Sequence, residues 1–484
     1  MKHYGHFIGG EWISSTDTID SINPASAKTW ATFAAGDAQT ADHAIKTAHA
    51  AFTNEWREFN PEQRADVIDR LATALETHWE SLVAAEVSDN GKRIAEVRGQ
   101  FAGLHTWFRH FANEARNMTP EAQTNGVPGV ESTLHHLPYG VVVAITPWNS
   151  PLMILAWKLA PALAAGNTVV VKPSEMASAS TLEFAKLAFE AGVPAGVLNV
   201  VTGYGHTVGE ALVRHPLTRK VTFTGSDFGG RKVAEAAANG VVPCVLELGG
   251  KSAQVVFADA DLDNTVNGIL SGIFLSNGQT CVAGSRLIVE KTIKNALTQR
   301  LLDVAGGLRL GDPMDAETQI GPLANEAHLR KVTEMVATAQ SEGARCLLDG
   351  RETAQGHEGY YFGPTIFDGV TQNMQLWREE VFGPVLAITS FETEAEAVSL
   401  ANDSDYGLAG GVWTQDPRKG ARVAAQIDAG TVYVNHYRSV DPNVPIGGIK
   451  LSGYGRELGP NAIKDFLQTK SIWIGSAPVA VPFP

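Results

Sequence analysis

The chain has 484 residues, enough for two or three domains with large hydrophobic cores. Its formal net charge of −14, without any basic run, argues against nucleic acid or an anionic membrane surface as a partner. Three cysteines cannot form a disulfide framework and the N-terminal residues lack the apolar core of a secretory signal, so we expect a cytoplasmic protein.

The N-terminal part predicts a hairpin followed by two long helices. Residues 7–13 suggest a short hairpin laid on the surface. Asn60 is a good N-cap, and apolar residues recur at helical spacing from there to residue 90. A second amphipathic helix is expected over residues 94–117. Residues 119–138 are polar and rich in proline and glycine, so we expect them to leave the domain.

Residues 140–249 carry the most regular pattern of the chain. Strands are expected at 140–145, 168–172, 197–201, 220–223 and 242–246, with helices at 152–165, 178–191, 207–214 and 231–238. Continuous β-branched runs that alternate with helices indicate a parallel sheet covered on both faces. Ligands bind such sheets at the carboxyl ends of the strands.

One uncharged stretch, residues 140–157, is nearly long enough to span a membrane. Pro147 and Pro151 interrupt it in the middle. We interpret it as a buried strand, a turn and the start of a helix.

A second alternating series follows Lys251 and predicts a second α/β domain. Strands are expected at 253–257, 285–290, 360–367, 384–391, 410–414 and 431–435, and helices at 264–275, 293–304, 326–341, 394–402 and 418–427. Residues 466–474 alternate apolar and polar side chains, as in a strand.

Cys281 is the candidate nucleophile. It lies between Gly278 and Gly284, after a helical run and before a strand-like run, which indicates a loop. Cys244 and Cys346 instead lie in apolar, strand-like segments. A free cysteine is most often a small buried hydrophobe, but the loop position makes Cys281 the exception.

Two polar residues could complete a site for covalent catalysis with Cys281. Glu247 heads a Gly-Gly turn after the fifth strand, where it could activate water, although an exposed turn acid is equally compatible with the pattern. Asn149 follows the first strand and could donate its amide to an oxyanion; a simple turn asparagine is the alternative.

The loops after the other strands suit a nucleotide. Residues 224–230 are rich in glycine and join a strand to a helix, although they do not match the GxGxxG fingerprint. Lys172 and Glu175 follow the second strand, where dinucleotide-binding folds place an acid for the ribose. A solvated turn is the alternative for both residues.

Eight motifs, in the family's order, resemble those of the NAD(P)-dependent aldehyde dehydrogenase superfamily over essentially the full chain. They are Thr146-Pro-Trp-Asn149, Trp157-Lys-Leu-Ala-Pro-Ala-Leu163, Lys172-Pro-Ser-Glu175, Phe223-Thr-Gly-Ser226, Glu247-Leu-Gly-Gly-Lys251, Gly278-Gln-Thr-Cys281, Glu379-Glu-Val-Phe-Gly-Pro384 and Ser452-Gly-Tyr-Gly-Arg-Glu457.

The resemblance implies an α/β fold with three parts. A Rossmann-like parallel-sheet domain for NAD would span residues 1–118 and 139–249, and a second α/β catalytic domain residues 250–450. A small β oligomerisation element would comprise residues 119–138 and 464–484. The expected assembly is a homodimer or a homotetramer.

The resemblance also implies the chemistry. Cys281 would form a thiohemiacetal with an aldehyde and then a thioester, Glu247 would activate the hydrolytic water, and Asn149 would bind the oxyanion. The implied cofactor residues are Thr146, Pro147, Trp148, Lys172, Glu175, Gly225, Ser226, Leu248, Glu380 and Phe382. Because a carboxylate at Glu175 repels a 2′-phosphate, NAD is preferred, with NADP possible.

Two alternatives stay open at this point. A CoA-acylating semialdehyde dehydrogenase would share the cysteine chemistry, but such relatives typically lack an acid at the position of Glu247. A non-catalytic, crystallin-like structural protein would share the fold, but Cys281, Glu247 and Asn149 are all present. We expect no metal, because the histidines lack supporting ligands.

The aldehyde pocket follows from the same resemblance. Its lining is expected to be Trp107, Phe108, Ser150, Met153, Trp157, Thr280, Val282 and Ile446. Many relatives have aromatic rings at the positions of Ser150 and Ile446, so a roomier pocket is expected, unlike one for acetaldehyde or betaine aldehyde. Arg438 could pair with a substrate carboxylate, although a solvated loop arginine is the commoner case.

Overall fold

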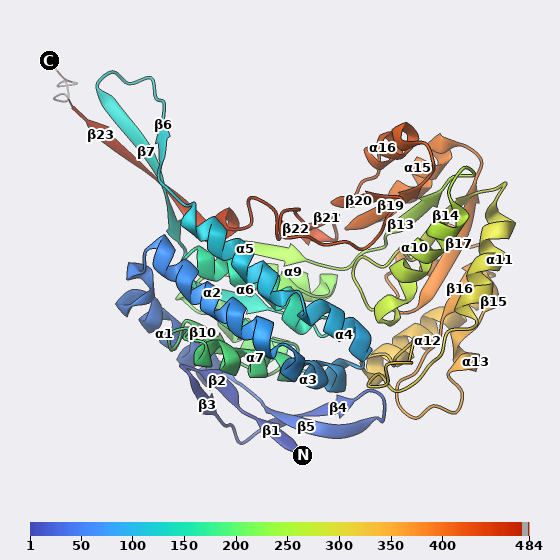
Figure 1. The fold of residues 1–484 in the computed structure, drawn as a ribbon, viewed down its shortest axis with the longest axis horizontal. Helices are drawn as coiled ribbons and strands as arrows, with labels where there is room; N and C mark the ends of the chain where they lie inside the picture. The colour runs from blue at the N-terminus through green and yellow to red at the C-terminus, as the bar shows by residue number, and fades with distance from the viewer. Residues whose placement is uncertain (477–482, 484) are drawn as a thin grey trace.

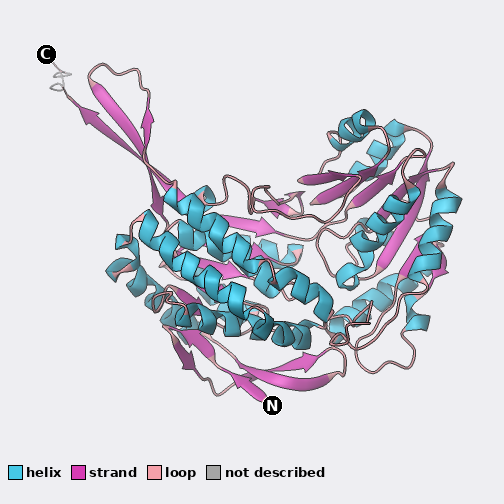
Figure 2. Cartoon of the chain, viewed as in Figure 1, coloured by secondary structure: helices cyan, strands magenta, loops and turns pink. Residues whose placement is uncertain are grey.

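The computed structural model describes residues 1–476 and residue 483. Two sheets with their helices stand side by side, and a narrow β arm projects from the first (Figure 1). Figure 2 shows helices packed along both sheets, as the alternating pattern predicts. The fold is therefore α/β with parallel sheets, in agreement with the sequence.

The first sheet has eight strands, and its five central strands are parallel. In spatial order these are β12 (Cys244–Glu247), β11 (Thr218–Thr224), β8 (Val141–Ile145), β9 (Thr168–Lys172) and β10 (Leu198–Val200). All five were predicted. The chain runs outward from β8 through β9 to β10 and then returns to β11, so the strand order reverses between β8 and β11. Such a reversal is where open α/β sheets bind ligands.

Antiparallel strands complete both edges of this sheet. β22 (Gly453–Tyr454) pairs with β12, and the hairpin of β2 (His6–Ile8) and β3 (Glu11–Ile13) pairs with β10. The predicted hairpin therefore forms, but its placement on the surface was wrong. His6, Phe7 and Ile8 are all buried, because β2 extends the sheet instead of lying over it.

Both long N-terminal helices are broken. The first is α2 (Pro61–His78) followed by α3 (Glu80–Asn90), and the Ser81 hydroxyl donates to the carbonyl of His78 at the break, at 2.7 Å. The second is α4 (Ile94–Phe101) followed by α5 (Leu104–Arg116), interrupted at Gly103, a weak helix former. The predictions of single helices were wrong at these two points.

The remaining helices of this part include α6, which begins directly after the turn that follows β8. They are α1 (Ala38–Asn54), α6 (Pro151–Ala164), α7 (Ala179–Glu190), α8 (Glu210–Arg214) and α9 (Asp227–Asn239), with a π-helical turn at Gly205–Gly209. The uncharged stretch 140–157 thus forms strand, turn and helix, as predicted. Among the described residues, no helix has both the length and the apolar character needed to cross a bilayer.

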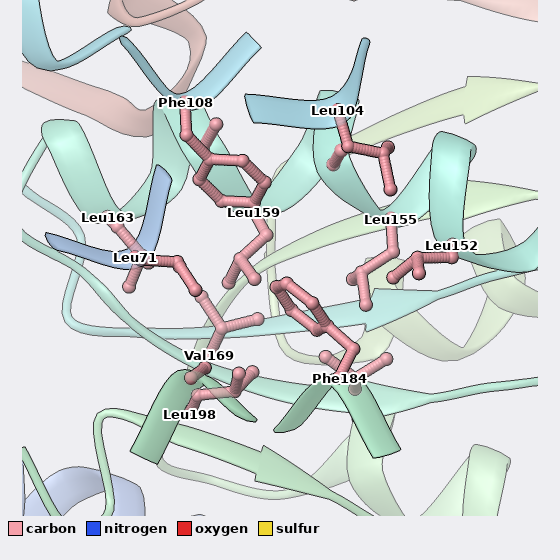
Figure 3. Packing of buried hydrophobic residues seen from close by; sticks show 14 of the residues in the cluster. Leu71, Leu104, Phe108, Leu152, Leu155, Leu159, Leu163, Val169, Phe184 and Leu198 are labelled. Carbon is pink, nitrogen blue, oxygen red and sulfur yellow. The ribbon is translucent and has the colours of Figure 1, made fainter. Parts of the chain in front are cut away.

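The main core lies between these helices and the sheet (Figure 3). Phe108 of α5 packs against Phe184 of α7, with ring centroids 5.9 Å apart. Leu159 of α6 and Val169 of β9 belong to the same cluster. The core therefore fixes α6, and with it the end of the turn that carries Asn149.

The second sheet has seven strands, all parallel to their neighbours except the edge strand β15. Its order is β15 (Arg345–Leu348), β16 (Thr365–Asp368), β17 (Val385–Phe391), β14 (Arg286–Glu290), β13 (Ala253–Val256), β19 (Ala409–Trp413) and β20 (Thr431–Val434). The strand predicted from residue 360 starts only at Thr365, because the backbone of Tyr360 bonds to Pro24 and Leu323 instead.

Helices flank the second sheet, and short elements join the parts. The helices are α10 (Leu262–Phe274), α11 (Lys294–Ala305), α12 (Glu326–Ser341), α13 (Gly350–Thr353), α14 (Gln375–Arg378), α15 (Glu394–Asn402) and α16 (Pro417–Ala424). The small strands are β1 (Lys2–Tyr4), β4 (Thr18–Asn23), β5 (Lys28–Ala34), β18 (Tyr406–Gly407) and β21 (Ile449–Lys450).

The projecting arm contains β6 (Glu121–Gln123), β7 (Val130–Pro138) and β23 (Leu467–Gly475), which form an antiparallel sheet (Figure 1). β23 pairs with β7 from Leu467↔Pro138 to Gly475↔Val130. Both the excursion at 119–138 and the C-terminal strand are thus confirmed. Residues 477–482 and 484 of the predicted oligomerisation element lie outside the described residues.

Candidate active site

A cavity of about 200 Å³ lies at the carboxyl ends of β8, β11 and β12. It is lined by Pro147, Trp148, Asn149, Ile154, Thr224, Gly225, Ser226, Leu248, Gly249, Cys281, His328, Lys331, Glu380 and Phe382. Nine of these residues were predicted for the site. The structure therefore brings together residues from both sheets at the strand-order reversal.

Cys281 lies half-buried on the turn between α10 and β14. Burial, with a smaller contribution from the carboxylates of Glu380 and Glu247, raises the pKa of its thiol to about 12. Hydrogen bonds to the sulfur from the backbone N–H groups of Cys281 and Val282 oppose this shift. The thiol is thus protonated at neutral pH and needs a base or a cation before it can attack.

The segment that joins the two sheets passes directly beside Cys281. A Cβ atom on Gly249 would lie 2.3 Å from Oε2 of Glu380, and one on Gly250 would lie 2.4 Å from the carbonyl oxygen of Cys281. Only glycine permits such approaches. The Gly-Gly pair after Glu247 therefore lets the backbone pass between the cysteine loop and Glu380.

Asn149 is held against the same loop. It precedes α6, is 8% exposed, and its Nδ2 donates to the carbonyl oxygen of Gln279 at 3.0 Å. An amide nitrogen carries two donor protons, so the second remains for a ligand beside Cys281. This geometry is compatible with the predicted oxyanion role.

Glu247 ends β12 and is buried. It does not line the 200 Å³ cavity, and its Oε1 has no hydrogen-bond partner among the described residues. Burial raises the pKa of its carboxyl well above the usual range, and the charge of Glu457 adds to the rise. Lys158 and Arg456 oppose it. A buried, unpartnered carboxyl of this kind can accept a proton from water.

Glu380 is fixed beneath the cavity by the backbone N–H of Gly250, which donates to Oε1 at 2.8 Å. Burial raises the pKa of its carboxyl to about 7. Phe382 has a left-handed backbone, with φ of +60°, and its ring packs edge-on against Trp148 at 5.3 Å. The predicted residues Glu380, Phe382 and Trp148 therefore form one wall.

Two residues of this wall were missed from the sequence. Nε2 of His328 lies 2.7 Å from the carbonyl oxygen of Phe382, and Lys331 donates to that of Glu380 at 2.9 Å. Both come from the start of α12, and burial lowers the pKa of His328 to about 4. Nothing in the local sequence marks them, because only the docking of α12 brings them here.

A second, larger cavity of about 720 Å³ lies between α8 and α9. It is lined by Ile145, Glu175, Gly205, His206, Gly209, Glu210, Val213, Arg214, Phe223, Phe228, Gly229, Lys232, Val233, Glu235 and Ala236. Glu175 reaches it while its Oε2 accepts a hydrogen bond from Lys172 at 2.9 Å. Lys172 and Glu175 are therefore neighbours at the end of β9, and their role toward a ribose stays a prediction.

The glycine-rich loop is shorter than predicted, because α9 begins at Asp227 and not at residue 231. Ser226 caps this helix, and its Oγ accepts the backbone N–H of Gly229 at 3.1 Å. The side chain of Ser226 is therefore engaged in the helix start. The Oγ1 atoms of Thr146 and Thr224 are buried and lack partners among the described residues.

The predicted aldehyde pocket is only partly consistent with the structure. The prediction that Phe108 lines this pocket was wrong. Phe108 is 1% exposed and packs into the core against Phe184, because its side of α5 faces α6 and α7 (Figure 3). Trp107 and Trp157 contact each other at 5.9 Å between ring centroids. The Ser150 hydroxyl accepts a hydrogen bond from Lys92 at 2.5 Å.

The other predicted lining residues differ in burial. Met153 and Ile446 are half-buried against the main core, and Thr280 is half-buried beside Cys281. Val282 packs with Leu408. Arg438 is also half-buried, and its guanidinium donates to backbone carbonyls of α10 and the following turn, so it is no solvated loop arginine.

Comparison with known proteins gives a consistent result. The sequence profile described as "Aldehyde dehydrogenase family" matches residues 12–472. The betaine aldehyde dehydrogenase of Bacillus subtilis (strain 168) is 39% identical over 480 residues, covering 98% of both chains. The NADP/NAD-dependent aldehyde dehydrogenase PuuC of Escherichia coli (strain K12) is 40% identical, covering 97% of this chain and 95% of its own.

Solved structures agree with the sequence comparison. The crystal structure of betaine aldehyde dehydrogenase from Staphylococcus aureus in complex with NAD+ superposes with a TM-score of 0.96 at 37% identity, over 99% of this chain and 96% of that one. A putative aldehyde dehydrogenase from Burkholderia cenocepacia gives 0.95 at 39% identity, over 99% and 100%. Matches of this extent leave no part of the architecture unaccounted for, and this chain belongs to the aldehyde dehydrogenase family.

Proposed function

We propose that this protein oxidises an aldehyde to the carboxylic acid with NAD as the hydride acceptor. The observation that carries the proposal is Cys281 on the wall of a cavity at the strand-order reversal, with the amide of Asn149 and the carboxyl of Glu247 near it. These are a nucleophile, an oxyanion donor and a base.

The residues present fit a dinucleotide. The 720 Å³ cavity beside Glu175 has room for an adenosine, and the 200 Å³ cavity beside Cys281 suits a ring with its ribose near Glu380. Thr146 and Thr224 retain buried hydroxyls that need partners. When bound, the cofactor supplies a hydride acceptor and a positive ring near the thiol. In this proposal residues 1–118 and 139–249 bind it, and residues 250–450 supply Cys281.

In the acylation step, the Cys281 sulfur attacks the aldehyde carbon as its S–H proton is released through water to solvent. The new oxyanion accepts hydrogen bonds from Asn149 Nδ2 and from the backbone N–H of Cys281. Collapse of this thiohemiacetal would pass hydride from carbon to the bound NAD and leave a thioester on the sulfur. Asn149 therefore lowers the barrier at the point where negative charge develops.

In the deacylation step, Glu247 takes a proton from water as the water attacks the thioester carbon. The C–S bond breaks, the carboxylic acid leaves, and the proton held by Glu247 returns to the Cys281 sulfur, which restores both groups. The raised pKa of Glu247 makes it a stronger base than an exposed carboxylate. This base favours hydrolysis over transfer of the acyl group to CoA.

The test is the NADH time course of Glu247→Gln. We expect one NADH per active subunit in a fast burst, followed by steady turnover about 100-fold or more below that of the parent protein. Equal steady-state rates would remove Glu247 from the mechanism. Product analysis with CoA present separates the alternatives: free acid supports hydrolysis, and acyl-CoA supports the CoA-acylating reaction. Absence of NADH with every aldehyde would leave only a structural role.

We also propose that the protein assembles as a homodimer or a homotetramer in the cytoplasm. The arm formed by residues 119–138 and 464–476 projects from the body (Figure 1). Trp473 and Ile474 on β23 are 56% and 61% exposed in the single chain. Apolar side chains on a projecting strand are normally covered by a second subunit.

A further inference from the structure

The turn that precedes Cys281 has an unusual backbone. Ser276, Asn277 and Gly278 all have left-handed φ angles, of +55°, +54° and +70°. Serine rarely adopts this conformation, which costs free energy and persists only where the surroundings enforce it. We call residues 276–278 the strained turn.

One support of the strained turn comes from the first sheet's helices. The Ser276 hydroxyl donates to Oε2 of Glu96, in α4, at 2.7 Å. The other oxygen of this carboxylate accepts from Arg93 at 2.7 Å, so Glu96 is itself fixed. Ser276 is 6% exposed and the Glu96 side chain 13% exposed, which protects the bond from solvent.

A second support comes from the loop after β20. Nη1 of Arg438 donates to the carbonyl oxygens of Ser271 at 3.0 Å and Leu275 at 3.2 Å, and Nη2 lies 3.5 Å from the Ser276 hydroxyl oxygen. These carbonyls close the C-terminal end of α10, where a cation is favourable. Arg438 is thereby tied to the backbone at the end of α10.

We propose that Glu96 and Arg438 are positioning residues that hold the strained turn, and through it the sulfur of Cys281, in the reactive geometry. Glu96 lies in α4, among the helices of the first sheet, and Arg438 follows β20 of the second sheet, so the turn before the nucleophile is held from both sheets. This inference rests on the proposed role of Cys281. It assigns Arg438 to the enzyme's own backbone and not to a carboxylate of the substrate.

Two substitutions of Ser276 distinguish the effect of losing its hydrogen bond from the effect of relieving the strained backbone. Ser276→Ala removes the hydroxyl but keeps a side chain in the left-handed conformation, and we expect alkylation of Cys281 by iodoacetamide to slow about tenfold, with a similar fall in kcat. Ser276→Gly removes the same hydroxyl and also the steric cost, so most of the alkylation rate should return. Equal losses in both variants, or no loss in either, would overturn the proposal.

The alkylation rate is read by mass spectrometry of the Cys281 peptide, with Cys244 in the same sample as the internal reference. This measurement needs no aldehyde, no cofactor and no turnover. If no aldehyde yields NADH, the proposed function fails, yet the Ser276 variants still test the strained turn. The two failures are therefore distinguishable.

Arg438→Leu distinguishes positioning from substrate binding. We expect kcat to fall by about tenfold for acetaldehyde and for succinic semialdehyde alike, with KM unchanged for both, because one hydrogen-bonded support is lost. Arg438→Lys, which can still donate to the two carbonyls, should recover part of this rate. A rise in KM confined to the carboxylated aldehyde would overturn the proposal. Arg422→Leu, which removes an exposed arginine paired with Glu394, is the matched control and should behave as the parent protein.

Discussion

Lys158 and Glu457 form an ion pair that is almost completely buried, and Thr222 also donates to the carboxylate. Lys158 lies on α6 and Glu457 follows β22, so the pair joins two distant parts of the chain. The charges of both residues act on Glu247: Glu457 raises the pKa of the Glu247 carboxyl and Lys158 lowers it. Burial is the main cause of the raised pKa of Glu247, and the two charges of the ion pair shift it further in opposite directions.

Opposite shifts in pH profile are expected from the two partners. A general base acts when deprotonated, so the hydrolysis rate rises with pH through the pKa of Glu247. Lys158→Met removes the charge that lowers this pKa and should move the rise to higher pH. Glu457→Gln removes the charge that raises it and should move the rise to lower pH. Steady-state rates from pH 5 to 9 measure both.

Each single variant leaves one buried charge without its partner, at a cost of about 3–5 kcal/mol in the free energy of unfolding. The double variant Lys158→Met/Glu457→Gln removes both charges and is the control for this cost. Shifts of the same sign in the two single variants would contradict the electrostatic coupling.

Cys281→Ala should abolish turnover without weakening NAD binding, because the sulfur is needed for the covalent step and not for the cavity walls. Titration calorimetry measures NAD binding, and NADH absorbance measures turnover. Cys244→Ala is the matched control: Cys244 is also half-buried, but its sulfur lies 2.9 Å from the Tyr454 hydroxyl on the edge of the first sheet. Turnover in Cys281→Ala would exclude the thiol as nucleophile.

Glu175→Gln should shift cofactor preference toward NADP. The change removes a negative charge that would repel a 2′-phosphate and frees Lys172, which now donates to Glu175. We expect kcat/KM with NADP to rise about tenfold, while kcat/KM with NAD falls. Glu190→Gln, on the exposed end of α7, should change neither value. An unchanged ratio would show that Glu175 does not face the ribose.

Phe108→Ala should act on stability alone. Because the ring fills the core between α5, α6 and α7, its loss should lower the free energy of unfolding by about 3–5 kcal/mol. KM for aldehydes should stay the same, because Phe108 lines neither the 200 Å³ nor the 720 Å³ cavity. Urea unfolding and steady-state kinetics measure the two quantities. Phe189→Ala, which removes a ring that is 42% exposed, should cost about 1 kcal/mol or less.

The sequence predicted the two sheets well because strands buried on both faces carry continuous apolar runs, as at β8 and β9. Breaks inside helices were not predictable in the same way. At the interruption after His78, the Ser81 hydroxyl donates to the carbonyl oxygen of His78. Such local competition leaves the apolar periodicity intact, so the pattern continues through the break.

Some residues of the candidate site were predictable from the sequence and others were not. Cys281, Asn149 and Glu380 come from loops with distinctive composition, and all three line the cavity. His328 sits on an amphipathic helix whose pattern reports only that one face is buried, not what that face covers. Phe108 shows the opposite error: it was assigned to the pocket but lies in the core. Periodicity places a residue on an apolar face of a helix but does not tell whether that face packs in the core or lines a pocket.

Two structural pairs join residues that are far apart in the sequence, and this affects how the chain folds during its synthesis. β7 is synthesised early, but Gln468 of its partner strand lies 330 residues beyond Pro138. Glu457 likewise follows Lys158 by 299 residues. The nascent polypeptide therefore carries β7 and Lys158 without their partners until 330 and 299 further residues have been synthesised, an interval in which chaperones can bind the exposed strand.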